Sequence, residues 1–192
     1  MKEDTFLSKG NKEVIFSPGE ANLLMLWIVI PILLIYCLPF YLLWGLRPLG
    51  EDLLVIKRFP FLSIIVFLAG IVLHELLHGL TWAIFCKKGF KAISFGVHWK
   101  SLTPFANCSE SLSVKQYALG GAMPAIILGV LPALCGVVIG NGAVFIFGLI
   151  FTVAAGGDIL VLFKLLKVDQ EKLIKDHPEK IGFIILEKNS VK

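Results

Sequence analysis

The sequence carries little charge for its length. Only 17% of its 192 residues are Asp, Glu, Lys or Arg, while 57% are hydrophobic. Soluble domains carry about 25% charged residues, so this composition does not fit a soluble globular protein. Several apolar stretches reach the roughly 20 residues that cross a bilayer as a helix. The remainder is too small for a second core, so we expect one membrane-embedded domain over residues 1–192.

The sequence also has no close cysteine pair and no pattern typical of a cleavable leader in its first residues. The four cysteines show no Cys-x-x-Cys spacing, which argues against a disulfide framework. The first twenty residues are polar and mixed in charge, so we expect no cleavable signal peptide. The net charge of +4 is modest and spread over loops. It fits contact with an anionic membrane leaflet, and we expect no nucleic-acid partner.

Four apolar stretches predict four membrane-spanning helices. They cover residues 21–44, 60–86, 118–140 and 142–166, and a charged tail follows at 167–192. Asn141-Gly142 is typical of a tight turn, so the last two helices should form an antiparallel hairpin.

Lys and Arg are unevenly distributed between the loops. The two tails and the loop after the second stretch hold 15 of them, and the other two connections hold three. Positive charge favours the cytoplasmic side. We therefore expect Lys2 and Lys192, and with them both termini, to be cytoplasmic and Arg47 to lie outside. The chain is thus predicted to be a multi-pass protein of the cell membrane.

The loop between the second and third stretches is expected to form a small β-hairpin. Residues 90–99 mix β-branched, aromatic and glycine residues, and residues 101–106 would return as a second strand. A strand-like run at 181–186 lies in the tail. The predicted fold class is an all-α polytopic membrane protein, with four transmembrane helices and a cytoplasmic β-hairpin between helices two and three.

The second stretch contains His74-Glu75-Leu76-Leu77-His78, a His-Glu-x-x-His pattern. Two histidines four residues apart project from one face of a helix, where their imidazoles can share a metal ion. The neighbouring Glu75 can then hold and deprotonate a metal-activated water. Ionisable groups are expensive inside a membrane and are functional there by default. The alternative is a polar cluster that joins helices.

A catalytic zinc usually takes three protein ligands, so one more is needed. The first and third stretches contain no Asp, Glu, His, Lys or Arg, and the fourth contains Asp158 with Lys164 near its end. His78 and Asp158 each precede the expected cytoplasmic end of their stretch by eight residues, about 12 Å along a helix. Asp158 is therefore the expected third ligand, and a helix-packing or ion-pathway carboxylate is the alternative.

These residues resemble the core of site-2-type intramembrane metalloproteases. More narrowly, the chain resembles a bacterial family of small membrane proteins described as putative zincin peptidases. That likeness rests on the His-Glu-x-x-His helix, Phe95-Gly96, Thr103-Pro104, Pro124, Gly157-Asp158-Ile159, Asp176-His177-Pro178 and Gly182-Phe183. It implies Zn²⁺, with His74, His78 and Asp158 as ligands and Glu75 as catalytic base. Asp158 stands in Gly-Gly-Asp-Ile, where many site-2 proteases have Asn-Pro-Asp-Gly or Leu-Asp-Gly.

The sequence thus predicts a bacterial membrane-embedded zinc metalloprotease that hydrolyses peptide bonds of membrane or membrane-proximal proteins. A metal-activated water and a glutamate base would carry the reaction, and the loop hairpin would hold an extended substrate by strand addition. One alternative is a non-catalytic metal-binding membrane protein, either a transporter or a regulatory partner. A di-iron carboxylate site is a further alternative, but such sites need a second Glu-x-x-His motif.

Overall fold

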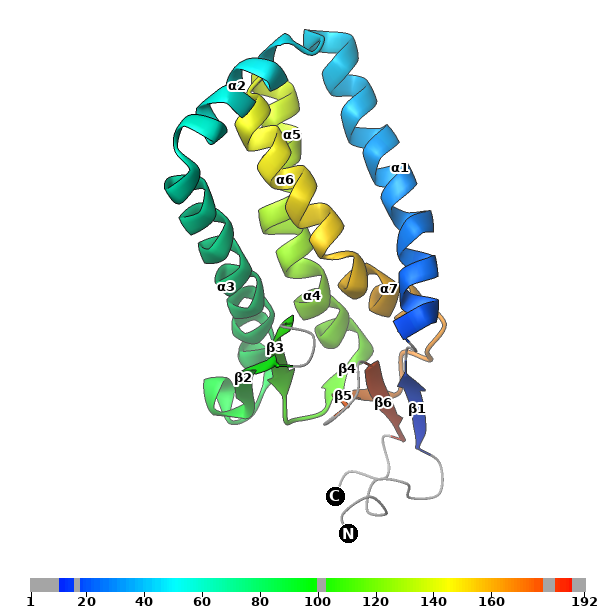
Figure 1. Ribbon diagram of the computed structural model, residues 1–192. Coiled ribbons are helices and arrows are strands. Elements are labelled where there is room, and N and C mark those ends of the chain that lie inside the picture. Colours follow the sequence, from blue (N-terminus) through cyan, green and yellow to red (C-terminus); the bar gives the residue numbers. More distant parts are fainter. Residues whose placement is uncertain (1–10, 16–17, 100–102, 178–181, 188–192) are drawn as a thin grey trace.

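The computed structural model is mostly helical and describes residues 11–15, 18–99, 103–177 and 182–187. Its α-helices are α1 (Pro18–Trp44), α2 (Arg47–Arg58), α3 (Pro60–Phe85), α4 (Val114–Pro124), α5 (Leu131–Ile139), α6 (Gly142–Ala154) and α7 (Gly156–Leu165), with a 3₁₀ turn at Gly89–Ala92 and a π-helical segment at Ala125–Val130. The strands are β1 (Lys12–Ile15), β2 (Ile93–His98), β3 (Thr103–Cys108), β4 (Leu112–Ser113), β5 (Leu173–Asp176) and β6 (Gly182–Leu186). The strands gather at one end of the helices and α2 lies at the other (Figure 1).

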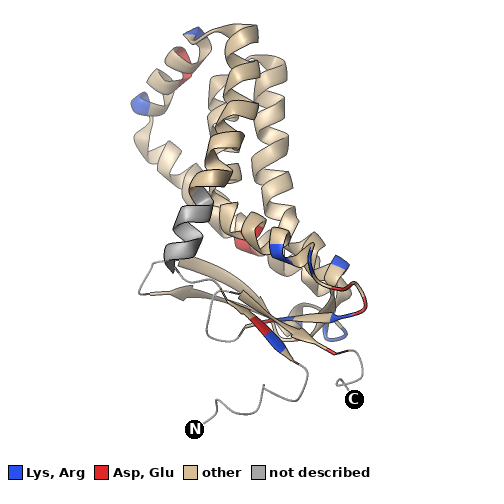
Figure 2. Ribbon diagram, turned by 90° about the vertical axis from the view of Figure 1, so that its right-hand side faces the viewer, with Lys and Arg blue, Asp and Glu red and all other residues tan. Residues whose placement is uncertain are grey.

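The long helices are compatible with a membrane protein. Among the described residues, Leu26–Trp44, Pro60–Phe85 and Val114–Ile139 are each long and apolar enough to cross a bilayer. A fourth span exists if α6 and α7 are counted together, although they are bent by 50°. Charged residues gather at α2 and at the end that holds the strands, whereas most of the helical middle carries none (Figure 2).

The fourth stretch is broken, where the sequence predicted one continuous helix over 142–166. Helix α6 ends at Ala154 and α7 begins at Gly156, after Ala155 at the bend. Glycine costs about 1 kcal/mol relative to alanine inside a helix, and Gly156 and Gly157 follow each other here. The bend places Asp158 in the first turn of a new helix.

The predicted antiparallel hairpin is formed by α5 and α6, which approach each other through small residues. A Cβ atom at Gly136 would lie 2.5 Å from the Phe145 nitrogen, and one at Gly148 would lie 2.7 Å from the Ala133 Cα. Close backbone approach over small residues is how helices associate within apolar surroundings. Gly140, at φ +69°, ends α5, and the Asn141 side chain accepts a hydrogen bond from the Val144 amide.

The connection between the first two stretches is helical, whereas a loop was expected from the sequence. Helix α2 has no buried residue, and apolar Leu53 and Leu54 are exposed beside its charged groups. The Asp52 carboxylate accepts hydrogen bonds from the Gly142 and Ala143 amides at 2.7 and 3.2 Å. Because the first amides of a helix have no partner within it, Asp52 caps α6 from α2.

The structure contains two antiparallel sheets, whereas the sequence predicted an all-α fold with a single β-hairpin. Strands β2 and β3 pair as the expected hairpin, with Phe95 opposite Ala106, and its turn at 100–102 lies outside the described residues. The second sheet has the order β1-β6-β5-β4, so the N-terminal and C-terminal segments lie side by side. The strand expected at 181–186 is therefore β6, whereas β1, β4 and β5 were not predicted from the sequence. Lys2, Pro178 and Lys192 lie outside the described residues.

The second sheet packs against the ends of α3 and α4 through a buried apolar cluster. The cluster includes Trp82 of α3, Tyr117 of α4, Ile174 of β5 and Phe183 of β6. Ile174 and Phe183 are fully buried. The sheet therefore fixes the strand-side ends of the two helices that lie next to the site described below.

Candidate metal centre

His74 and His78 lie one turn apart in the C-terminal half of α3, as their spacing predicts. Their side chains are 12% and 6% exposed, and their ring centroids are 5.0 Å apart. The N-terminal half of α3, by contrast, is largely exposed from Phe61 to Leu68. The two imidazoles therefore occupy the part of the helix that packs against the rest of the protein.

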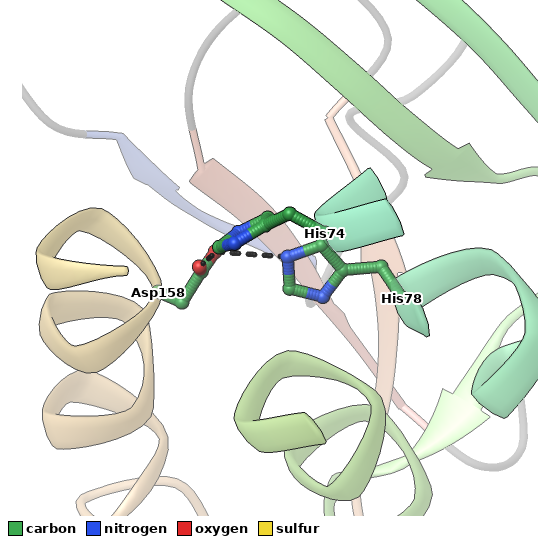
Figure 3. A group of neighbouring side chains, drawn as sticks. All are labelled: His74, His78 and Asp158. Carbon is green, nitrogen blue, oxygen red and sulfur yellow. Dashed lines mark hydrogen bonds and ion pairs between the residues drawn. The ribbon is translucent and has the colours of Figure 1, made fainter. Parts of the chain in front are cut away.

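Asp158 of α7 faces both histidines (Figure 3). Its Oδ2 atom lies 3.1 Å from His74 Nε2, and its Oδ1 atom lies 3.4 Å from His78 Nε2. The Asp158 side chain is 27% exposed, which makes it the most open of the three. The three residues predicted from the sequence are thus brought together across a separation of 84 residues.

The protonation of His78 is constrained by α4. Its Nδ1 atom lies 2.9 Å from the Gly120 carbonyl oxygen. A carbonyl only accepts, so Nδ1 must carry the proton, and in a neutral ring Nε2 then presents a lone pair. That lone pair would face the Asp158 carboxylate, which also only accepts. A proton shared between the two groups, or a cation between them, would satisfy the contact.

A zinc ion fits this donor set. Atoms bound tetrahedrally at about 2.0–2.1 Å from zinc lie roughly 3.3 Å from one another. The two histidine Nε2 atoms lie 3.1 and 3.4 Å from the Asp158 carboxylate, each from a different oxygen. All three ligand atoms lie within 4.8 Å of one another, and within the described ranges this is the group of His, Cys, Asp or Glu residues that could hold a metal. Two imidazoles and a carboxylate are typical of a catalytic zinc with one open position.

Glu75 lies beside these residues, not among them. It is half-buried, it interacts electrostatically with His74, His78 and Asp158, and the backbone of Ala106 in β3 lies within hydrogen-bonding reach of it. Consecutive helical residues point about 100° apart. A carboxylate in this position can therefore act on a molecule bound next to the three ligands.

Aromatic rings continue from His78 toward the second sheet. His78 stacks on Trp82 at 5.3 Å between centroids, and Trp82 stacks on Tyr117 at 5.2 Å. The Trp82 indole also donates a hydrogen bond to the Tyr117 carbonyl at 3.1 Å. A Cβ atom at Gly120 would collide with this indole. Gly120 therefore permits the stacking and also supplies the carbonyl that orients His78.

Several contacts of the site were missed by the sequence analysis. The Gly120 carbonyl and the Ala106 backbone leave no chemical signature in a sequence, because every residue has these atoms. The sequence signal for close approach was the Gly120-Gly121 pair. The remaining histidines lie elsewhere: His98 packs on Phe105, and His177 lies 3.9 Å from Glu13.

Comparison with known proteins gives one result. A protein-family profile described as "putative zincin peptidase" matches residues 67–173. The match covers more than half of the chain and includes His74, His78 and Asp158. Searches of curated proteins and of solved structures found no match. The match supports a metallopeptidase and implies zinc. The chain therefore belongs to the putative zincin peptidase family.

Proposed function

We propose that this protein is a membrane-embedded zinc metalloprotease of the site-2 type, acting on membrane or membrane-proximal proteins. The observation that carries the proposal is the convergence of His74, His78 and Asp158, with Glu75 beside them, in the apolar helical part of the protein. Zinc, when bound, supplies Lewis acidity toward water and toward a peptide carbonyl. A non-catalytic metal site is not favoured, because the family described for this chain is a peptidase family.

Glu75 is proposed as the general base. Its carboxylate would take the proton of the attacking water and pass it to the nitrogen of the departing amine. Contact with the Ala106 backbone would hold the carboxylate in one orientation. His78 is held by Gly120 in the form that leaves its Nε2 atom free for a metal. These contacts would keep acid–base chemistry and metal binding on separate side chains.

The substrate is proposed to be bound in extended form. Helical peptide bonds are protected by their hydrogen bonds, so a membrane segment must unwind before hydrolysis. Strand β3 lies beside Glu75 through Ala106. A substrate strand added to this hairpin would pass the candidate zinc site. The excess of Lys and Arg in the terminal and hairpin-bearing segments supports placing this end of the protein in the cytoplasm.

Glu75→Gln tests the proposed reaction, because the amide keeps the size of the side chain but cannot act as a base. We expect the variant to bind zinc like the wild type and to lose hydrolysis by roughly 10²–10⁴-fold. The assay measures cleavage of a panel of single-pass transmembrane reporter peptides in liposomes, with a chelator control. Glu51→Gln, on α2 at the opposite end of the helices, is the matched control and should cleave normally.

Two results would count against this proposal. Equal cleavage by Glu75→Gln and by wild type would remove Glu75 from the mechanism. Absence of chelator-sensitive cleavage by the zinc-loaded wild type across the whole panel would favour a metal site without catalysis, in a transporter or a regulatory partner.

A further inference from the structure

Asp176, the last residue of β5, is an acidic side chain buried outside the candidate metal centre. It is 9% exposed. Its Oδ1 atom accepts a hydrogen bond from the Tyr117 hydroxyl at 2.5 Å, and its Oδ2 atom accepts one from the Cys108 amide at 2.6 Å. Each oxygen therefore binds a donor from a different element, Tyr117 from α4 and Cys108 from β3.

Burying a carboxylate in this cluster is costly. Desolvation raises the pKa of Asp176 to about 6, against the lowering effect of its two hydrogen bonds. Ile174 in the same strand and Phe183, the cross-strand partner of Asp176 in β6, are apolar and fully buried. A well-packed apolar side chain would often be as stable at such a position. The cost of this carboxylate therefore points to a role in positioning the elements that it binds.

Both donors belong to segments that contact the candidate site. Tyr117 lies one turn before Gly120, whose carbonyl holds His78. Cys108 lies two residues after Ala106, whose backbone lies at Glu75. Tyr117 also stacks on Trp82, and Trp82 stacks on His78. One carboxylate thus connects the segment that orients a proposed ligand with the segment that orients the proposed base.

We propose that Asp176 is a positioning residue of the candidate metal centre, which it holds together by binding Tyr117 of α4 and Cys108 of β3. The inference rests on the proposed function and goes beyond it, because it assigns a role in the site to the C-terminal sheet. Residue 176 lies outside the segment that matches the family profile. Asp176 acts through Gly120 and Ala106 and does not touch the reacting atoms.

The test measures zinc affinity of the purified protein in detergent by competition with a chromophoric chelator. Asp176→Asn keeps the shape but leaves one acceptor for two donors, and Tyr117→Phe removes one hydrogen bond. Loss of a group that orients a metal ligand typically costs about 10–100-fold in affinity, and we expect about 10-fold for each variant. The double variant should be weakened by less than the product of the two single effects, because both substitutions alter the contact between residue 176 and residue 117.

Ile174→Ala is the matched control. Ile174 lies in the same strand and is fully buried, and it makes no side-chain hydrogen bond. Its truncation should lower the thermal midpoint at least as much as Asp176→Asn but leave zinc affinity within about twofold of the wild type. An equal loss of zinc affinity in Ile174→Ala would overturn the proposal, because sheet stability alone would then explain the effect. Unchanged affinity in both Asp176→Asn and Tyr117→Phe would overturn it as well.

A second measurement, amide hydrogen exchange, needs neither bound metal nor the Asp176→Asn variant. In metal-free protein, Tyr117→Phe should raise amide hydrogen exchange in the peptides covering 103–108 and 114–124, but not in 142–154. Unchanged exchange in the first two peptides would contradict the proposal even if the wild type bound no zinc. If the wild type binds zinc but cleaves nothing, the protease proposal fails while the role of Asp176 is still decided by affinity.

Discussion

At the residue scale, the site depends on which atom of each side chain faces which neighbour. His78 uses Nδ1 for the Gly120 carbonyl, and this leaves Nε2 toward Asp158. Asp176 uses one oxygen for Tyr117 and the other for Cys108. In both cases a side chain with two polar atoms joins two elements, so removing one contact should affect the other.

Asp158→Asn should sharply reduce zinc retention, because the amide keeps the shape of the side chain but loses the charge that a ligand needs. The loss should exceed the roughly 10–100-fold expected when only a supporting hydrogen bond is removed. Zinc is measured by elemental analysis after gel filtration. Asp52→Asn is the control: it weakens the cap of α6 and should keep zinc. Full occupancy in Asp158→Asn would leave Asp158 as a packing or pathway residue.

The raised pKa of Asp176 predicts a pH dependence of stability. Its pKa is about 6 in the fold against an ordinary 3.8, so the unfolded chain loses the proton first as pH rises. The contribution of Asp176 is fully present below about pH 4 and is lost as pH rises through 6, by at most about 3 kcal/mol. Tyr117 and Cys108 stay protonated over this range, since burial raises the pKa of Cys108 to about 12.

Asp176→Asn cannot titrate at this position. The difference in thermal midpoint between wild type and Asp176→Asn, measured in detergent from pH 4 to 7, should therefore shift in favour of the variant as pH rises. A difference that does not change with pH would show that Asp176 titrates normally.

At the scale of elements, the bend between α6 and α7 and the close packing of α5 on α6 decide where Asp158 lies. Close packing here depends on three glycines. A Cβ atom at Gly129, which precedes α5, or at Gly136 in α5 would meet the backbone of α6. A Cβ atom at Gly148 in α6 would meet the backbone of α5 and of Gly129. Helix α7 then departs at 50° from α6 and brings its first turn to α3. A straight continuation would carry Asp158 in a different direction.

Gly148→Ala should destabilise the protein, because the new Cβ atom would lie 2.7 Å from both the Ala133 Cα and the Gly129 carbonyl oxygen. Overpacking of this kind costs about 1–3 kcal/mol. Thermal unfolding in detergent measures it. Gly50→Ala in α2 is the control: a Cβ atom there meets nothing within 4 Å, so this variant should be as stable as the wild type or more stable. Equal midpoints for the two variants would contradict the packing argument.

At the scale of the whole molecule, the strands, with β1 and β6 among them, share one end and α2 occupies the other (Figure 1). Pairing of β1 with β6 places the two terminal segments next to each other. The loop charges favour the cytoplasm for this end. The candidate site, at the strand-side half of α3, would then be closer to the cytoplasmic face of the bilayer.

Cysteine labelling tests this orientation. In a background without the four native cysteines, Arg47→Cys should react with an impermeant thiol reagent applied to intact cells, and Lys12→Cys should react only after lysis. Both positions are exposed. The reverse pattern would invert the orientation and place the site toward the other compartment. Labelling of both positions from outside would contradict the prediction that β1 lies on the cytoplasmic side.

Local patterns in the sequence were sufficient for the long apolar helices, the β2–β3 hairpin, strand β6 and part of the site. Hydrophobic stretches predict long helices because a bilayer demands about 20 apolar residues. The spacing of His74 and His78 predicts a shared face because 3.6 residues complete a turn. Asp158 was expected because the other stretches offered few ionisable residues. The structure brings this carboxylate to both imidazoles, and zinc binding itself stays a prediction.

The tertiary structure alone decided what surrounds these residues. Strand β5 is short and α2 is amphipathic, so neither gave a long apolar signal, and both were missed. The Gly120 carbonyl and the Ala106 backbone acquire their roles only through contacts between distant segments. Asp176 looks like part of a charged tail in the sequence, yet it is buried between α4 and β3. Backbone groups are the same in every residue, and long-range pairing leaves no periodicity, so only the folded chain could show these contacts.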